Sequence, residues 1–260
     1  MRPDLARARR RGAVAIAIDG PGGAGKSTLA KMVAEALGFV YVDTGAMYRA
    51  AALYCMRKGI DLSDGSLLAR RLQSVEAVLD SMDLEIKFVD GAQKIFLCGG
   101  DVTEAIRDSA VGTGASQVSV IPAVREKLVA LQRKLAQDCD VVMDGRDIGT
   151  HVLPNARLKI YLDADLKTRV TRRLKDLREK GREAESVEVE RELRERDHRD
   201  MTRDASPLCK ADDAVVLDTS NLTREEAREK IIELFRRGSE FSLRENGLTA
   251  GSLEVTRNVL

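Results

Sequence analysis

The chain has 260 residues, of which 43 are Lys or Arg and 42 are Asp or Glu, so its formal net charge at pH 7 is +1. This length suffices for one α/β domain with an insertion, or for two small lobes. The balanced charge does not favour nucleic acid as a partner, and no apolar run approaches the roughly 18 residues that a membrane-spanning helix needs.

Neither the N-terminal segment nor the cysteines indicate export. Residues 7–11 are rich in arginine but lack a following signal-peptide pattern, and we interpret them as a short solvated arm rather than a contact for a polyanion. The four cysteines lie far apart and the chain has two histidines, so neither a zinc cluster nor a disulfide framework is indicated. We expect a cytoplasmic protein with reduced thiols and no membrane partner.

A glycine-rich motif follows the first apolar run, at residues 14–18, and opens a segment with helical apolar spacing. Its G-x4-G-K-S pattern between a predicted strand and a predicted helix is typical of a P-loop, and a chance glycine-rich turn is the alternative. In a P-loop, backbone N–H groups face a phosphate chain, Lys26 reaches the β and γ oxygens, and Ser27 can ligate Mg²⁺. We therefore expect a nucleoside triphosphate with Mg²⁺. The expected binding residues are Gly20, Pro21, Gly22, Gly23, Ala24, Gly25, Lys26, Ser27 and Thr28.

Short apolar runs separated by helical patterns predict an α/β fold with a five-stranded parallel sheet covered on both faces. The runs span residues 14–18, 39–42, 139–143, 158–162 and 214–217. Ligands of such sheets gather at the carboxyl ends of the strands. The P-loop and the acids that end two further strands, Asp43 and Asp144, are therefore expected to meet.

Residues 63–105 interrupt this alternation. A helical pattern runs over 67–79, and two apolar runs, 84–89 and 94–97, flank Asp90-Gly91. An Asp-Gly pair between apolar runs favours a tight turn, so we predict an inserted helix and β-hairpin. A further core helix is predicted behind Pro122.

The segment 165–204 is dense in charges of both signs and predicts two exposed helices joined near Gly181. Such a segment is usually a solvated, ion-paired face. Beside a P-loop we favour a mobile lid that carries arginines onto phosphates. Arg172 and Arg173 are adjacent on a helix and point in different directions, so at most one of them is expected to reach the phosphates.

The last predicted helix begins at a capping box formed by Thr223 and Glu226 and ends near Gly238. Residues 238–260 have few apolar residues and no clear period. We expect them to be a disordered tail or an extension foreign to the natural chain.

Arginines gather around the expected site, at Arg49, Arg146, Arg196 and Arg203, and no guanine-reading Asn-Lys-x-Asp segment is seen. Guanidinium groups bind phosphate oxygens in pairs and offset charge during transfer. Arginines beyond the triphosphate cradle therefore indicate a second phosphorylated ligand, and with it a phosphotransferase.

Five ordered blocks resemble bacterial cytidylate kinases, over about residues 13–237. They are Ile18-Asp-Gly-Pro-Gly-Gly-Ala-Gly-Lys-Ser-Thr28, Asp43-Thr-Gly-Ala-Met-Tyr-Arg49, Ala115-Ser-Gln-Val118, Asp144-Gly-Arg-Asp-Ile-Gly-Thr150 and Glu195-Arg-Asp-His-Arg-Asp200. The resemblance implies a three-layer P-loop kinase core at 13–62 and 106–237, an inserted NMP-binding subdomain at 63–105, and a helical lid at about 165–204.

The resemblance implies transfer of the γ-phosphoryl group of ATP to CMP or dCMP, with Mg²⁺, in pyrimidine nucleotide metabolism, by a monomer. It assigns catalysis to Lys26 and Arg146 and a metal contact to Ser27, a position that can be glycine in the family. Thr44 stands where the family often has serine. The resemblance further assigns binding of the acceptor's phosphate to Thr44, Arg49, Arg146 and Arg203. It assigns binding of the ribose to Arg196 and Asp200, and binding of the cytosine to Ser116, Arg125 and Asp147.

Base choice also has a physical argument. Cytosine has an exocyclic amine where uracil has a carbonyl oxygen, so the Asp147 carboxylate accepts a bond from one and repels the other, while Ser116 and Arg125 donate to N3 and O2. Each residue has an ordinary alternative role. Ser116 could cap a turn, Arg125 could pair with an acid, and Asp147 could hold Mg²⁺ through water.

Three rival functions remain compatible with a P-loop. The nearest is a small-molecule kinase that acts on UMP, AMP or shikimate. Another is a nucleotide-dependent switch or nucleic-acid-associated ATPase that uses the basic N-terminus. The third is a catalytically silent nucleotide-binding scaffold, against which Lys26, Arg146 and Asp147 argue. A panel of acceptors separates these functions.

Overall fold

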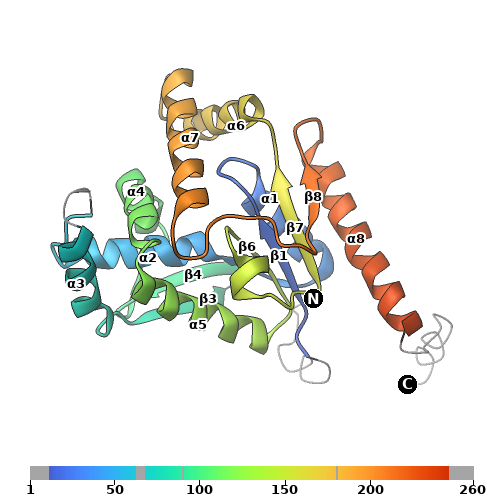
Figure 1. Cartoon of the computed structure of the whole chain (residues 1–260), viewed down its shortest axis with the longest axis horizontal. Helices are drawn as coiled ribbons and strands as arrows, with labels where there is room; N and C mark the ends of the chain where they lie inside the picture. Colours follow the sequence, from blue (N-terminus) through green and yellow to red (C-terminus); the bar gives the residue numbers. More distant parts are fainter. Residues whose placement is uncertain (1–11, 63–67, 90, 180, 246–260) are drawn as a thin grey trace.

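The computed structural model describes residues 12–62, 68–89, 91–179 and 181–245 (Figure 1). A five-stranded parallel sheet with the strand order β2-β6-β1-β7-β8 forms its centre. The strands are β1 (Ala15–Asp19), β2 (Val40–Asp43), β6 (Val141–Gly145), β7 (Leu158–Asp163) and β8 (Val215–Asp218). The predicted α/β fold and its five strands are confirmed.

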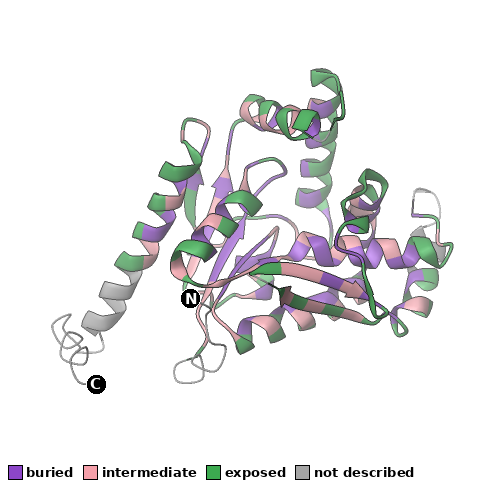
Figure 2. Ribbon diagram, turned by 180° about the vertical axis from the view of Figure 1, so that it is seen from behind, coloured by how far each residue is buried: buried purple, intermediate pink, exposed green. Residues whose placement is uncertain are grey.

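Both faces of this sheet are covered by helices. Ile16 and Ile18 of β1 pack in the cluster that includes α1 (Lys26–Leu37) and α8 (Arg224–Glu245). Ala17, between them, packs on the opposite face in the cluster that includes α5 (Pro122–Asp138) and the π-helical turn η4 (Ile148–Val152). Because successive strand residues face opposite sides, a sheet buried on both sides reads as continuous apolar runs. Figure 2 shows this burial along the central strands.

The parallel register brings several polar strand ends to one edge. Asp19 at the end of β1 lies opposite Gly145 of β6 and Tyr161 of β7. Asp43 at the end of β2 lies opposite Asp144 of β6. The P-loop leaves β1 at this edge, so chain segments far apart in the sequence converge there.

The inserted segment contains α3 (Leu68–Leu79) and a sheet of β3 (Leu84–Val89), β4 (Ala92–Leu97) and the short β5 (Gly100–Asp101). The predicted helix and hairpin are therefore observed, and Gly91 in the turn has a positive φ of 77°. Leu67, the start of the predicted helix, lies outside the described residues. The two residues of β5 have no apolar pattern, which is why the sequence did not predict them.

Three helices connect the inserted segment to the central sheet: α2 (Thr44–Arg57), α4 (Ser109–Val118) and α5. Val75 of α3 and Ile95 of β4 belong to the same apolar cluster as Met47 of α2 and Leu128 of α5. The inserted elements are thus packed on helices of the main body. Gln93 of β4 adds a polar link, because its amide bonds both the backbone N–H and the carbonyl of Asp43, at 2.8 and 3.2 Å.

The charged segment forms α6 (Leu166–Glu179) and α7 (Ser186–Thr202), which lie beyond the carboxyl ends of the strands (Figure 1). The two predicted helices are therefore observed. They share a small apolar core of Val170, Leu177, Val189 and Leu193. A few apolar side chains at helical spacing thus hold together a pair whose remaining surface is charged.

Helix α8 continues to Glu245, so the predicted end near Gly238 is wrong. A glycine inside a helix costs about 1 kcal/mol relative to alanine, which is too little to end a helix whose next residues are tolerated in helices. The tail expected from residue 238 therefore begins in a helix, and residues 246–260 lie outside the described residues. Within the described part of the chain, no helix is both long enough and apolar enough to cross a membrane.

Gly20, at the start of the P-loop, supplies a test of the fold. It has a φ of 148°, and a Cβ there would lie 2.0 Å from the carbonyl oxygen of Leu162 in β7. We expect Gly20→Ala to lower the free energy of unfolding by about 3 kcal/mol, because strain and a backbone collision add. Urea denaturation measures this loss.

Gly38 is the matched control. It also has a positive φ, of 70°, but nothing lies within 4 Å of a Cβ built on it. Gly38→Ala should cost only about 1 kcal/mol, from the left-handed backbone alone. Equal losses in the two variants would contradict the close approach of the P-loop to β7.

Candidate active site

The P-loop spans the gap between β1 and α1. Gly25 is the N-cap of α1 with a φ of 93°, and no side chain caps this helix end. Uncapped N–H groups in the first turn of a helix, together with its positive dipole end, form a ready seat for an anion. The local geometry is therefore the one that a phosphate chain needs.

Lys26, the first residue of α1, is 6% exposed. Its Nζ donates to the carbonyl oxygen of Pro21 at 2.6 Å, within the same loop. Burial, and then the nearby charge of Arg146, lower the pKa of Lys26 well below its ordinary value. A phosphate oxygen placed here would relieve both effects, because an anion favours the charged ammonium.

A hydroxyl and a carboxylate meet beside the P-loop. Ser27 Oγ donates to Asp144 Oδ2 at 2.8 Å, and Tyr41 OH donates to Asp144 Oδ1 at 2.8 Å. Burial, and then the charge of Asp43, raise the pKa of Asp144. A buried carboxylate beside an exposed hydroxyl fits the preference of Mg²⁺ for a few hard oxygen ligands beside phosphates.

Asp144 and Tyr41 were not among the predicted binding residues. The sequence does contain a signal for Asp144, since it is an acid that ends an apolar strand in a P-loop protein. The predicted Thr44 contacts the same residue from the N-terminus of α2, where its Oγ1 donates to the Asp144 carbonyl at 2.7 Å.

Two predicted arginines are each held by a carboxylate at the edge of the sheet. Arg49 Nη2 lies 2.9 Å from Asp43 Oδ2, and Asp43 also caps α2 by accepting from the N–H of Ala46. Arg146 Nε lies 2.6 Å from Asp200 Oδ2, on α7. These ion pairs fix the guanidinium groups before any ligand is present.

Arg196 approaches the same carboxylate more loosely. Its Nε lies 4.0 Å from Asp200 Oδ2, and its side chain is 47% exposed. The charge of Arg146 is the main cause that lowers the pKa of Arg196 to about 10. This crowding of cations indicates a site that lacks negative charge.

A buried cluster lies next to these arginines. Asp147 pairs through Oδ2 with Arg125 Nη2, and through Oδ1 with Arg203 Nη2 at 3.3 Å. Arg125 therefore does pair with an acid, and that acid is another predicted site residue. A carboxylate has about four acceptor positions, so Asp147 keeps capacity for further donors.

Two further side chains complete the description of this cluster. Burial raises the pKa of Tyr48 to about 12, and the charges of Arg125, Asp147 and Arg203 act on it as well. Tyr48 thus lies close to the cluster, although it was not predicted. Ser116 is half-buried on α4, where its carbonyl accepts from Ser119 Oγ at 2.9 Å. Among the described residues, no hydrogen bond or ion pair joins Ser116 to Asp147.

Asp19 ties the P-loop strand to the loop that follows β6. Its carboxylate accepts from the N–H groups of Ile148 and Gly149, at 2.8 and 2.7 Å. It thereby supports the segment that carries Arg146 and Asp147. Burial is the main cause that raises the pKa of Asp19 from 3.8 to about 6. The sequence places Asp19 directly before the P-loop, but nothing local reveals its distant partners.

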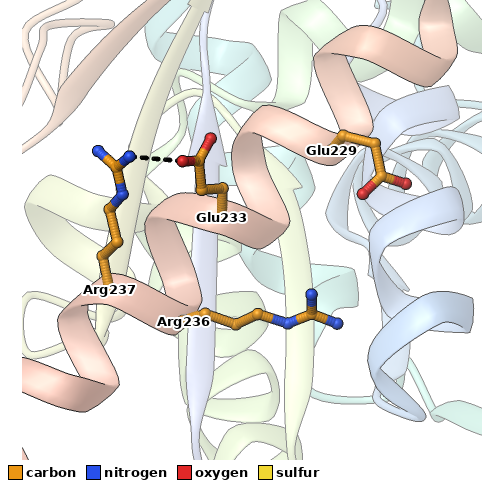
Figure 3. Close-up of a pocket in the computed structure, with 4 residues that line it drawn as sticks. All are labelled: Glu229, Glu233, Arg236 and Arg237. Atoms are coloured by element: carbon orange, nitrogen blue, oxygen red, sulfur yellow. Dashed lines mark hydrogen bonds and ion pairs between the residues drawn. The ribbon is translucent and has the colours of Figure 1, made fainter.

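A hollow lies away from this site, along α8, and four charged side chains of that helix line it (Figure 3). They are Glu229, Glu233, Arg236 and Arg237, and Arg237 pairs with Glu233 at 2.5 Å. Ion pairs between successive turns of one helix are typical of a surface exposed to solvent. We assign it no part in the chemistry at the sheet edge.

Comparison with known proteins gives one family. A model of the cytidylate kinase family matches residues 16–237. A cytidylate kinase of Caldicellulosiruptor bescii is 50% identical over 220 residues, covering 85% of this chain and 94% of that protein. The cytidylate kinase of Caldicellulosiruptor saccharolyticus is 48% identical with the same coverage, and that of Bacillus licheniformis is 45% identical over 84% and 94%.

The raised pKa of Asp19 predicts how the stability of the protein depends on pH. Its folded-state pKa of about 6 lies above the ordinary 3.8, so the folded state keeps a proton that the unfolded state has lost. Stability therefore falls as the pH rises through this window, and Asp19 accounts for about 3 kcal/mol of the fall.

The matched variant is Asp19→Asn, which keeps one carbonyl acceptor but does not titrate. We expect the unfolding free energy of the variant to decline less than that of the wild type between about pH 4 and pH 6, by about that amount. Above this window the two curves should run parallel. Urea denaturation at several pH values measures the difference, and identical pH profiles would contradict the assignment.

Proposed function

The chain belongs to the cytidylate kinase family and is an ATP-dependent phosphotransferase that acts on CMP and dCMP, and we propose that the carboxyl edge of the sheet carries out this transfer. One observation carries the assignment. Arg146 is linked to both halves of the site: its charge lowers the pKa of Lys26 in the P-loop, and it directly precedes Asp147, whose carboxylate pairs with Arg125 and Arg203.

On the donor side, residues 20–28 hold the phosphates of ATP. The uncapped start of α1 and the buried ammonium of Lys26 support this role. Ser27 and Asp144 hold Mg²⁺, which supplies positive charge to the phosphates of the bound nucleotide. The bond between Ser27 Oγ and Asp144 Oδ2 supports this pairing of ligands.

On the acceptor side, Thr44, Arg49, Arg146 and Arg203 hold the phosphate of CMP. The carboxylates that already pair with these arginines keep the guanidinium groups at the sheet edge without the cost of ordering free side chains. Arg196 and Asp200 bind the ribose hydroxyls. Their separation of 4.0 Å is compatible with a sugar that bonds to both.

Asp147 reads the base. Its carboxylate accepts a bond from the exocyclic amine of cytosine, and Arg125 and Ser116 donate to N3 and O2. Asp147 pairs with two buried arginines, which fix its carboxylate in the cluster, and the carboxylate oxygens repel the corresponding oxygen of uracil. Discrimination of this kind is large because UMP leaves buried polar groups unpaired or repelled.

The reaction then needs little covalent help from the protein. An oxygen of the CMP phosphate, already ionised at neutral pH, attacks the γ-phosphorus in line, and the bond from that phosphorus to the β–γ bridging oxygen breaks. Lys26 and Arg146 offset the charge on the transferring group and align the two polyanions. No strong general base is required.

The same proposal assigns roles to the larger parts of the chain. Residues 63–105 act as the NMP-binding subdomain, and residues 165–204 act as a lid over the P-loop. We further propose that the enzyme works as a cytoplasmic monomer on small nucleotides, without a nucleic acid partner. The near-neutral formal charge of +1 supports the last point.

A substrate panel tests the acceptor. We expect rapid ADP release from Mg-ATP with CMP or dCMP, and little with UMP, AMP or shikimate, in a coupled assay. Asp147→Asn should lower the CMP to UMP ratio of kcat/KM by about 100-fold, since it removes the charge that repels uracil. Lys26→Ala should abolish turnover with every acceptor, and Glu229→Ala, on the outer face of α8, should behave as wild type.

Other results on this panel would overturn the proposed roles. ADP release without an acceptor would indicate an ATPase, and preference for shikimate or AMP would remove the base assignment. An unchanged CMP to UMP ratio in a folded Asp147→Asn protein would show that another residue reads the base.

Titration with Mg²⁺ tests the metal ligands. Asp144→Asn should raise the Mg²⁺ concentration for half-maximal turnover by at least about tenfold, because it removes an anionic ligand. Tyr41→Phe keeps the carboxylate and removes only a bond to it, so its effect should be smaller. Equal Mg²⁺ dependence of Asp144→Asn and wild type would exclude this ligand.

A further inference from the structure

A buried ion pair joins the two lid helices. Arg169 of α6 lies with its Nη1 2.5 Å from Oδ2 of Asp197 on α7. The side chains are 10% and 11% exposed. None of the contacts assigned above to ATP, Mg²⁺ or CMP involves either residue, so the pair is not accounted for by the reaction as described.

The pair hydrogen-bonds both backbone polar groups of one P-loop residue, Gly22. Asp197 Oδ1 accepts from the backbone N–H of Gly22 at 3.1 Å, and Arg169 Nη1 donates to the Gly22 carbonyl at 3.1 Å. The fit is close, since a Cβ at Gly23 would lie 3.3 Å from Cβ of Arg169. Both polar backbone groups of Gly22 therefore have side chains of α6 and α7 as hydrogen-bond partners.

The same contacts reach Lys26 through a single peptide group. The N–H of Gly22 and the carbonyl of Pro21 belong to one peptide unit. Asp197 accepts from its N–H, and Lys26 Nζ donates to its oxygen at 2.6 Å. Successive hydrogen bonds through a peptide polarise one another. The orientation of this peptide thus links the carboxylate of Asp197 to the ammonium of Lys26.

A second arginine of α6 holds the loop two residues further on. Arg172 Nη1 donates to the Ala24 carbonyl at 3.1 Å, and its Nη2 donates to the Thr219 carbonyl at 2.7 Å. Helix α6 therefore contacts the P-loop at two backbone carbonyls. Loop conformation and lid position depend on each other at both points.

Cohesion of the lid does not require the ion pair. The apolar contacts of Val170 and Leu177 with Val189 and Leu193 already hold α6 against α7. Buried ion pairs are in general weak contributors to stability, because desolvation offsets their attraction. A role in stability alone therefore leaves the two bonds to Gly22 unexplained.

We propose that Arg169 and Asp197 are positioning residues that set the Pro21–Gly22–Gly23 backbone, and through it the place of Lys26, for the phosphates of ATP. This inference rests on the proposed function, in which the P-loop binds ATP. The hydrogen bonds of the pair lie on the donor side, and none that the structure describes joins it to Arg49, Asp147 or Arg203. Its link to the acceptor side is the charge of Asp197, which acts on Arg146.

The test compares two ways of removing the pair. Asp197→Ala leaves Arg169 unpaired and buried, whereas the double variant Arg169→Met with Asp197→Leu removes both charges together and retains packing. Glu190→Ala is the matched control, since it breaks an exposed pair with Arg194 on the same helix. Circular dichroism and thermal unfolding identify the variants that are folded.

We expect the double variant to be folded, to lose about 100-fold in kcat, and to bind ATP about tenfold more weakly in calorimetry. Its affinity for CMP should stay within about twofold of wild type. Asp197→Asn, which keeps an acceptor for the Gly22 N–H, should recover part of the loss. Glu190→Ala should match wild type.

The outcomes separate this inference from the proposed function. A folded double variant with unchanged ATP affinity and kcat would overturn the positioning role, as would equal weakening of ATP and CMP binding. A wild type that transfers nothing to CMP would overturn the proposed function instead. In that case ATP affinity, measured by calorimetry without an acceptor, still decides whether the pair positions the P-loop.

Discussion

Three carboxylates buried at the ends of neighbouring strands, Asp19, Asp144 and Asp147, are the constraint on which the site depends. A buried carboxylate is costly unless it is hydrogen-bonded or paired. Each of the three meets this requirement with partners from distant parts of the chain. The partners are Ile148 and Gly149 for Asp19, Ser27 and Tyr41 for Asp144, and Arg125 and Arg203 for Asp147. Losing any of these contacts would leave a charge without compensation, so the loops around the sheet edge have little freedom.

This arrangement suits a reaction between two polyanions. Arginines that are held by carboxylates before the ligand arrives need not lose conformational freedom when it binds. Lys26 is buried, and its pKa is lowered. Its charged form becomes more favourable when a phosphate is near. With the roles proposed here, the site is organised for the charge that develops in transfer, and the protein supplies positioning and electrostatics rather than an acid or base.

The parts that the sequence predicts are those with a local physical cause. The strands follow from apolar runs, the P-loop from glycine spacing, and the hairpin from Asp90-Gly91 between two such runs. Contacts over long sequence separations have no such local signal. The bonds of Asp19 to η4, and of Asp197 to Gly22, join residues 129 and 175 positions apart. The end of α8 was misjudged because a single glycine was weighted as a stop signal.

The contacts of α6, in the segment predicted to be a lid, show the same limit. Helix geometry predicts that adjacent Arg172 and Arg173 cannot both face the phosphates, but it does not say what they face instead. In the structure, Arg169 and Arg172 both donate hydrogen bonds to P-loop carbonyls, so arginines of α6 contact the backbone of the loop. If the lid helices moved away, Gly22 would lose its partners on both sides, at a cost of about 1–3 kcal/mol for each buried group left unpaired. The P-loop therefore moves with α6 and α7, or the loop must find replacement partners in water or nucleotide. In either case, a displacement of these helices changes the hydrogen bonds that place Lys26.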